Sequence, residues 1–235
     1  IQSMIRMVVF DMAGTTVDED NVVYKTIQRS LNEAGYPATL EEVLIHCAGK
    51  EKLRAIKDIL EIKFDLVDDE IARKIHTAFR GLLTVAYDEL DVKPIRGADE
   101  IFAYLKEAGL YCVLNTGYDH DTAHKLLHKL GWENGSSIDA VVTASDVSSN
   151  RPEPDMILLG MKKMGITNPL EVIKVGDSAI DIEEGQNAGC GLNVGITTGA
   201  QTREQLHQQH PDHVIDDLRE LIEIIRKNNN VPQQY

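Results

Sequence analysis

The chain has 235 residues, a size that suits one sizeable domain or a domain that carries a smaller insert. Its hydrophobic fraction of 43% allows a buried core. Its formal net charge of −14 argues against nucleic acid and anionic membrane surfaces as partners, because both would repel it at long range. An anionic ligand would therefore need a local cluster of cations and backbone N–H groups.

The three cysteines, Cys47, Cys112 and Cys190, lie far apart and show no CxxC spacing. Such a sparse, odd count is typical of reduced thiols in a cytoplasmic protein. No apolar run is long enough to span a bilayer, and no charged-then-apolar leader is evident, so we expect a cytoplasmic location. The Asn- and Gln-rich residues 228–235 are expected to form a frayed tail.

Short apolar runs alternate with longer amphipathic stretches along much of the chain. Each run is largely apolar, which is typical of strands that are buried on both faces of a parallel sheet. The predicted strands span residues 5–11, 110–115, 140–143, 172–175 and 191–194. Helical patterns such as residues 99–108 and 216–227 separate several of them. The sequence therefore predicts an α/β fold with a doubly wound parallel sheet.

One interval, from about residue 17 to residue 92, breaks this alternation. It contains only helical patterns, which cover residues 23–34, 40–48, 52–62 and 68–90. A helical block inserted after the first strand predicts a small α-helical cap domain over residues 18–92. The α/β core is then expected to comprise residues 4–17 and 93–227.

Asp11 closes the first predicted strand and is followed by the small residues Ala13, Gly14 and Thr15. A turn of small residues can direct backbone N–H groups at phosphate oxygens, so we expect an anion-binding nest beside this carboxylate. An aspartate after a strand is more often a turn or cap residue. Polar residues at the ends of the other predicted strands favour a functional role for Asp11.

Polar residues follow three further predicted strands. Thr116 and Gly117 come after the second strand and offer a hydroxyl and free N–H groups at a helix start. Arg151 follows the third strand in an Arg-Pro-Glu-Pro loop, where a guanidinium can hold a phosphoryl group. Asp177 and Asp181 follow the fourth strand and could bind Mg²⁺ beside Asp11. Because ligands of open α/β sheets bind at the carboxyl ends of the strands, these elements together indicate one site.

The order DxxGT, then Thr, then Arg before Pro-x-Pro, then GDxxxD resembles the haloacid dehalogenase superfamily over nearly the whole chain. The resemblance implies that Asp11 attacks phosphorus and forms an aspartyl-phosphate. It implies that Thr116 and Arg151 hold the phosphoryl oxygens. It also implies a Mg²⁺ cofactor bound by Asp11, the backbone carbonyl of Ala13, Asp177 and, in support, Asp181.

Position 13 departs from the pattern of most phosphatases in this superfamily. They carry a second aspartate there as general acid and base, and without that acid a simple alkoxide is a poor leaving group. The dehalogenases also lack this aspartate but dispense with the metal, whereas Asp177 and Asp181 are present here. The run from Asp11 to Asp18, together with Thr116-Gly117-Tyr118 and Arg151, is instead similar to the phosphonatase family.

In phosphonatases a cap lysine forms a Schiff base with the substrate aldehyde, and the protonated imine accepts the electrons of the breaking C–P bond. The family's glycine matches Gly49, and its lysine matches Lys52. A lysine at a helix start is more often a solvated surface residue, and Lys50 is an alternative imine former. To act as a nucleophile, Lys52 needs a depressed pKa, which closure of the cap could provide by desolvation.

Two cap positions differ from the phosphonatase pattern. That family carries a histidine three residues after the lysine and a methionine just before the glycine, both implicated in acid–base work. The matching residues here are Ala55 and Ala48. The chain therefore resembles a sister group of the phosphonatases, whose substrate need not be the same.

The sequence thus predicts a Mg²⁺-dependent hydrolase that releases phosphate from a small phosphonate or phosphate metabolite. Two alternatives stay open: a P–O phosphatase similar to phosphoglycolate or sugar phosphatases, and a catalytically silent binder of a phosphate ligand. No nucleic acid or membrane partner is expected, and a homodimer is compatible with the sequence. The expected substrate-binding residues are Ala13, Gly14, Thr15, Gly49, Thr116, Gly117, Tyr118 and Arg151.

Two sets of histidines are further candidates. One set recurs every four residues on a predicted helix and is expected to be solvated rather than metal-binding: His120, His124 and His128. The other is expected in a polar surface loop: His207, His210 and His213.

Overall fold

The computed structural model describes residues 3–132 and 135–230. Its main feature is a sheet of six parallel strands in the order β5-β4-β1-β6-β7-β8. The strands are β1 (Met7–Phe10), β4 (Tyr111–Thr116), β5 (Ala140–Thr143), β6 (Val172–Gly176), β7 (Leu192–Ile196) and β8 (His213–Ile215). The predicted doubly wound α/β fold is therefore confirmed. Because β4 and β6 flank β1, the switch point of the sheet lies at the carboxyl end of β1.

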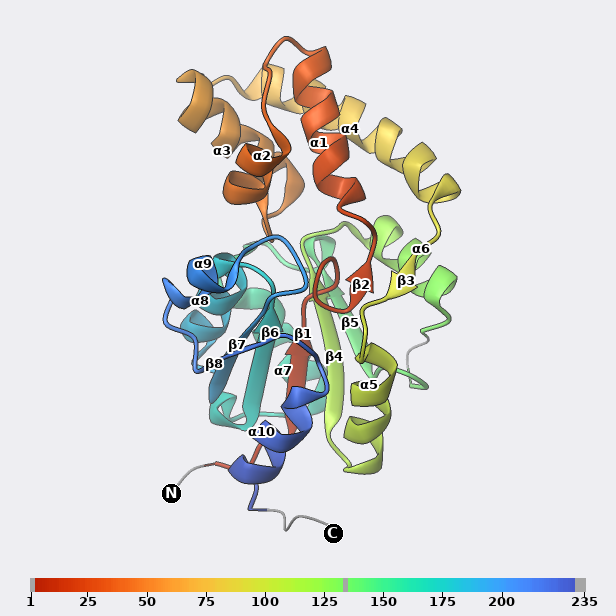
Figure 1. Cartoon of the computed structure of the whole chain (residues 1–235), viewed down its shortest axis with the longest axis vertical. Helices are drawn as coiled ribbons and strands as arrows, with labels where there is room; N and C mark the ends of the chain where they lie inside the picture. The colour runs from red at the N-terminus through yellow and green to blue at the C-terminus, as the bar shows by residue number, and fades with distance from the viewer. Residues whose placement is uncertain (1–2, 133–134, 231–235) are drawn as a thin grey trace.

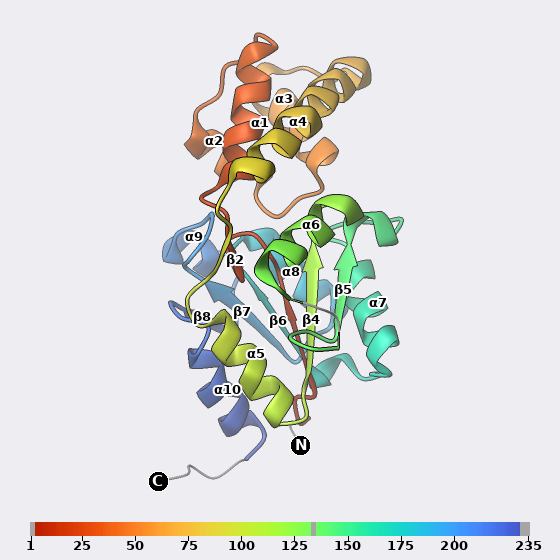
Figure 2. The same cartoon turned by 90° about the vertical axis from the view of Figure 1, so that its right-hand side faces the viewer.

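Helices cover both faces of this sheet (Figure 2). Met7 and Val9 of β1 pack in a cluster with α7 (Asp155–Met164), beside which lies α8 (Ala179–Ala188). Val8 and Phe10 point to the opposite face, which α5 (Ala98–Glu107) and α10 (Glu220–Asn228) cover. Burial on both faces explains why the strand is continuously apolar rather than alternating.

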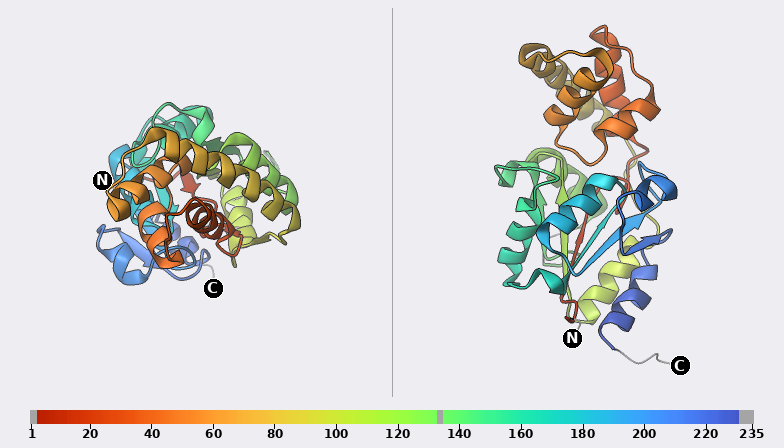
Figure 3. Two further views of the ribbon diagram at one scale, coloured as in Figure 1. Left: turned by 90° about the horizontal axis from the view of Figure 1, so that it is seen from above. Right: turned by 90° about the vertical axis from the view of Figure 1, so that its left-hand side faces the viewer.

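Four helices lie between the short antiparallel strands β2 (Val17–Asp18) and β3 (Lys93–Pro94). They stand together beyond the carboxyl ends of the β-strands, as Figures 1 and 3 show. Buried apolar side chains from all four helices form their shared interior. They are α1 (Val22–Glu33), α2 (Leu40–Cys47), α3 (Lys52–Phe64) and α4 (Asp69–Glu89). We call this group the helical insert.

The region around the last three histidines differs from its prediction. His207 ends the helix α9 (Arg203–His207) and His213 begins β8, so the expected polar loop is wrong, although the three side chains are exposed. In β8 only Ile215 is fully buried, which leaves too little apolar pattern to predict a strand. His120, His124 and His128 lie on α6 (His120–Leu130), where His120 and His128 are exposed.

The end of the chain also differs from the expected tail. Asn228 belongs to α10, and the Asn229 side chain exchanges two hydrogen bonds with the backbone of Ile5. Asn229, a residue of the expected frayed tail, is therefore held against the residues that precede β1. Residues 231–235 of the expected tail lie outside the described residues. Within the described chain no helix is both long and apolar enough to cross a membrane, and all three cysteines are buried and unpaired.

Candidate active site

The turn after β1 places Asp11 at the switch point. Three successive N–H groups, those of Thr15, Thr16 and Val17, donate to the carbonyl of Met12. The N–H of Gly14 donates to the carbonyl of Val17. The N–H groups of Gly14 and Thr15 are therefore used inside the turn, and the predicted anion nest is wrong for them.

Gly14 and Thr15 contribute instead by holding Asp177. The Thr15 hydroxyl donates to Asp177 Oδ1 at 3.0 Å, and the Ala200 N–H donates to Oδ2 at 2.7 Å. Gly14 has a φ of +81°, and a Cβ there would lie 2.5 Å from Asp177 Oδ2. Only glycine combines this backbone conformation with so close an approach. The DxxGT motif thus fixes a second carboxylate beside Asp11.

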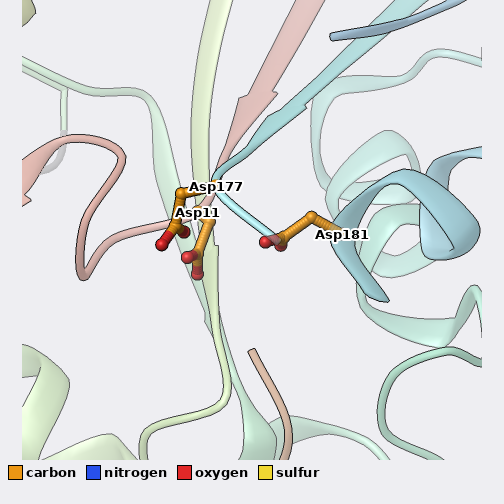
Figure 4. Close-up of side chains that lie close together, drawn as sticks. All are labelled: Asp11, Asp177 and Asp181. Carbon is orange, nitrogen blue, oxygen red and sulfur yellow. The ribbon is translucent and has the colours of Figure 1, made fainter. Parts of the chain in front are cut away.

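Three buried carboxylates gather at this point, those of Asp11, Asp177 and Asp181 (Figure 4). Asp11 and Asp177 follow β1 and β6, and Asp181 reaches them from the first turn of α8. One oxygen atom of each lies within 4.8 Å of the others. Burial, together with repulsion from Asp11 and Asp181, raises the pKa of Asp177 well above its usual value. So crowded an anionic cluster requires cations.

Arg151 supplies the first cation. Its Nη1 donates to Asp11 Oδ1 at 3.0 Å and lies 3.2 Å from Asp181 Oδ1, and its Nε donates to Glu184 Oε2 at 2.9 Å. Its Nη2 donates to both oxygen atoms of Asn115, at 3.0 and 2.9 Å. These bonds hold the guanidinium beside the expected nucleophile.

Lys174 and Glu184 are two site residues that the sequence analysis missed. The Lys174 ammonium lies 3.0 Å from Glu184 Oε2 and 3.3 Å from Asp181 Oδ1, and both side chains are buried. A signal was present in the sequence, because a lysine within the buried strand 172–175 must have a buried anionic partner. Its partner Glu184 lies on α8, the helix that follows this strand, and belongs to no sequence motif.

Glu184→Ala is expected to lower the free energy of unfolding by about 3–5 kcal/mol, because it leaves Arg151 and Lys174 short of a buried anionic partner. Its carboxylate also accepts a hydrogen bond from the Asn115 amide at 2.8 Å. Urea unfolding measures the effect. Glu183→Ala, a half-buried neighbour on α8, is the matched control. A loss no larger than that of the control would contradict the assigned role.

The loop before α3 brings the helical insert onto this cluster. The carbonyl of Gly49 accepts a hydrogen bond from Arg151 Nη1 at 3.1 Å, and the N–H of Gly49 donates to the Tyr24 hydroxyl. A Cβ on Gly117 would lie 2.7 Å from the carbonyl oxygen of Lys50. The glycine after Thr116 therefore allows the two loops to meet. Thr116 itself is buried at the end of β4, and its hydroxyl accepts the N–H of Tyr118.

Lys52 and Lys50 have different surroundings. Lys50 forms an ion pair with Asp58 at 2.6 Å. Lys52 is 8% exposed, and its ammonium donates to the Lys50 carbonyl at 2.7 Å and lies 5.7 and 5.5 Å from the ring centres of Tyr24 and Tyr118. No described carboxylate forms a salt bridge with Lys52, and burial lowers its pKa. Lys52 is thus the more reactive amine of the two.

Glu19 forms a second buried cluster with two tyrosines, which sequence reasoning also missed. The hydroxyls of Tyr87 and Tyr118 both donate to Glu19 Oε2 at 2.5 Å, and they lie 2.9 Å from each other. These residues come from three separate segments: the loop before α1, the end of α4 and the loop after β4. No local pattern in the sequence connects them.

A cavity of about 590 Å³ opens between the helical insert and the sheet domain. Lys52, Tyr87, Gly117 and Tyr118 are among the residues that line it. Its volume suits a small metabolite. The cavity therefore has Lys52 of the helical insert and the loop that follows Thr116 in its wall.

Carboxylates and cations buried together at the switch point of a parallel sheet are typical of α/β enzymes that stabilise the charge of a phosphoryl group. The chain belongs to the haloacid dehalogenase-like hydrolases, whose family model matches residues 8–195. It is therefore a hydrolase, and the resemblance drawn from its motifs is confirmed.

Individual relatives refine this comparison. The chain is 29% identical over 238 residues to a phosphonoacetaldehyde hydrolase of Bacillus cereus, covering 94% of this chain and 87% of the relative. A solved structure of a phosphonoacetaldehyde hydrolase-like protein from Oleispira antarctica has a TM-score of 0.84 at 24% identity, with 97% and 94% covered. A predicted phosphoglycolate phosphatase from Haemophilus somnus has a TM-score of 0.77 at 19% identity, with 95% and 99% covered. Both solved structures share the fold of this chain.

Proposed function

We propose that the protein cleaves the C–P bond of phosphonoacetaldehyde or a related carbonyl phosphonate, with Lys52 as the imine-forming residue. The observation that carries this proposal is the Lys52 side chain, which is buried, free of any described salt bridge and part of the lining of the cavity. Ala13 supports it, because no general acid stands two residues after Asp11 to assist an alkoxide leaving group. Residues 18–92 act as the cap domain that brings Lys52 to the site.

In the proposed reaction, the neutral Lys52 amine adds to the carbonyl carbon, and loss of water leaves a protonated imine. A carboxylate oxygen of Asp11 then attacks phosphorus while Thr116 and Arg151 hold the phosphoryl oxygens, Arg151 exchanging its hydrogen bond to Asp11 for one to the substrate. The C–P bond breaks, and its electron pair passes into the imine to give an enamine. Water hydrolyses the aspartyl-phosphate to phosphate. The proton released in that hydrolysis goes to the enamine carbon, and hydrolysis of the resulting imine releases the aldehyde and Lys52, so one water is consumed overall.

The carboxylate cluster fits a Mg²⁺ ion. Magnesium binds oxygen ligands at about 2.1 Å in octahedral geometry, so opposite ligands lie about 4.2 Å apart. The carboxylate oxygens of Asp11, Asp177 and Asp181, all within 4.8 Å of one another, meet that need with small adjustments. Asp11, Asp177 and the backbone carbonyl of Ala13 would hold the ion, with Asp181 in support. When bound, Mg²⁺ supplies positive charge that neutralises the phosphoryl oxygens.

Removal of divalent cations with EDTA is expected to reduce phosphate release to background, and added Mg²⁺ is expected to restore it. Titration calorimetry tests the site independently of turnover. Asp177→Asn should weaken Mg²⁺ binding, whereas Asp18→Asn, an exposed aspartate on β2, should not. Full activity in EDTA, or equal Mg²⁺ affinity in the two variants, would contradict the assignment.

A panel of carbonyl phosphonates, simple phosphonates and phosphate esters tests the proposed bond. Phosphate release is expected from phosphonoacetaldehyde or another carbonyl phosphonate, and not from phosphonates that lack a carbonyl group. Release from phosphate esters alone would favour the P–O phosphatase alternative and refute C–P cleavage.

A further inference from the structure

Glu19 is the most deeply buried carboxyl group of the helical insert and its flanking loops. It is 3% exposed, and its Oε1 has no hydrogen-bond partner among the described residues. Its surroundings include Tyr24 of α1, Lys52 of α3, Tyr87 of α4 and Tyr118 after β4. An unpartnered carboxyl oxygen buried beside the proposed imine-forming lysine calls for an explanation.

The hydrogen bonds of this cluster can be counted. Glu19 Oε2, the Tyr87 hydroxyl and the Tyr118 hydroxyl form a triangle with separations of 2.5, 2.5 and 2.9 Å. Each separation is a hydrogen-bond distance, so a complete ring requires three protons. The two tyrosines supply two. With both tyrosines donating to Glu19, the side of the triangle between their hydroxyls holds no proton. When the Glu19 carboxyl carries a proton and donates it to one tyrosine, all three sides are filled, so the ring can hold either two or three protons.

The burial of Glu19 favours the three-proton form of the ring over the two-proton form. Burial raises the pKa of Glu19, against the opposing effects of the Tyr118 and Tyr87 hydroxyls, the charge of Lys52 and the backbone N–H of Val23. Tyr118 lies beside both groups, because its hydroxyl donates to Glu19 and the Lys52 ammonium lies 5.5 Å from the centre of its aromatic ring. Tyr87 and Tyr118 also line the cavity. The two residues that are hydrogen-bonded to Glu19 thus also belong to the wall of the cavity.

We propose that Glu19, acting through Tyr118 and Tyr87, is the proton donor and acceptor for imine formation and hydrolysis at Lys52. This inference rests on the proposed function. It assigns to Glu19 the acid–base work of the histidine and methionine that phosphonatases carry, which are replaced here by Ala55 and Ala48.

Imine formation and imine hydrolysis together leave the number of protons on the ring unchanged. When the neutral amine adds to the carbonyl carbon, one N–H proton passes to the carbonyl oxygen, giving a carbinolamine. The ring then gives one proton to that hydroxyl group, the C–O bond breaks, and water leaves behind the protonated imine. Hydrolysis of the imine reverses these transfers and returns the proton to Glu19. The ring therefore needs no other acid or base.

Borohydride trapping of the imine formed with phosphonoacetaldehyde tests the proposal, with the trapping rate measured against pH. The wild-type rate is expected to rise as Lys52 loses its proton and to fall again as Glu19 loses its own. Glu19→Gln keeps the size of the side chain and its hydrogen bonds to the tyrosines but cannot exchange the proton. This variant should lose the falling limb and form the imine roughly 10²–10⁴-fold more slowly.

A second assay separates proton transfer from a structural role. Hydrolysis of p-nitrophenyl phosphate requires Asp11 but no imine, so Glu19→Gln should impair it far less than it impairs imine formation. Tyr87→Phe removes one proton of the ring and should also slow trapping, whereas Tyr36→Phe, a tyrosine of the insert packed on Phe64, serves as the matched control.

Two results would overturn the assignment of Glu19. One is a Glu19→Gln variant with the wild-type trapping rate and both limbs of the pH profile. The other is an equal loss in both assays, which would indicate a purely structural role. A wild-type protein that forms no adduct would instead refute the proposed function itself, and the two failures are thereby distinguished.

Discussion

Asp11→Asn is expected to reduce phosphate release by roughly 10⁴-fold or more, because the substitution removes the attacking oxygen without changing the shape of the side chain. Folding should be retained. The variant loses one negative charge from three crowded carboxylates, and Arg151 keeps its contacts with Asp181, Glu184 and Asn115. Phosphate release and the melting temperature, measured on the same preparation, test both parts of this prediction.

Asp18→Asn provides the control for Asp11→Asn, because Asp18 lies in the same segment but is exposed. It should behave as wild type in both assays. Unchanged phosphate release by Asp11→Asn would show that Asp11 is not the nucleophile. Wild-type protein without phosphate release from any member of the panel would favour the alternative of a catalytically silent phosphate-ligand binder.

The fold could be predicted where the local pattern matched the global packing. The strands around Asp11 are buried on both faces, so their largely apolar runs were visible in the sequence. β8 could not be predicted, because it is short, lies at the sheet edge and buries only Ile215 fully. β2 and β3 are two-residue strands, too short to give any periodicity.

The candidate site was visible in part for a similar reason. Asp11, Arg151 and Asp177 follow strands and Thr116 ends one, and parallel strands bring their carboxyl ends to one edge. The buried charged residues that contact them lie at positions for which no such rule exists. Glu184 lies in the middle of α8, for example, where the sequence shows only one of several acidic residues.

The burial of Lys52 is the clearest case of a property that only the tertiary structure provides. A lysine at the first position of a helix is usually solvated, and Glu51, which caps α3, gives this segment the look of a charged surface. The docking of the loop at Gly49 and Lys50 onto Arg151 and Gly117 places the amine inside the molecule instead.

Lys52→Met is expected to abolish C–P cleavage, lowering phosphate release from phosphonoacetaldehyde by roughly 10³-fold or more, because a thioether cannot form an imine. Methionine keeps most of the unbranched side chain, so the packing between the two tyrosine rings should survive. In the wild-type protein, borohydride should trap a covalent adduct at Lys52, which mass spectrometry of the digested protein can locate. Lys50→Met is the matched control, since Lys50 forms an ion pair with Asp58.

The pH dependence of this trapping follows from the lowered pKa of Lys52. Burial, with Arg151 in support, disfavours the ammonium form, against the opposing effects of Asp11, Glu51 and Glu19. Because only the neutral amine attacks a carbonyl, the trapping rate should rise with pH in a range below that of an ordinary lysine, whose pKa is about 10.4. A rise only near that ordinary value, or an adduct located at Lys50, would show that Lys52 is not the activated amine. Phosphate release from phosphonoacetaldehyde by Lys52→Met at the wild-type rate would remove the imine from the mechanism and leave Asp11 to break the bond unaided.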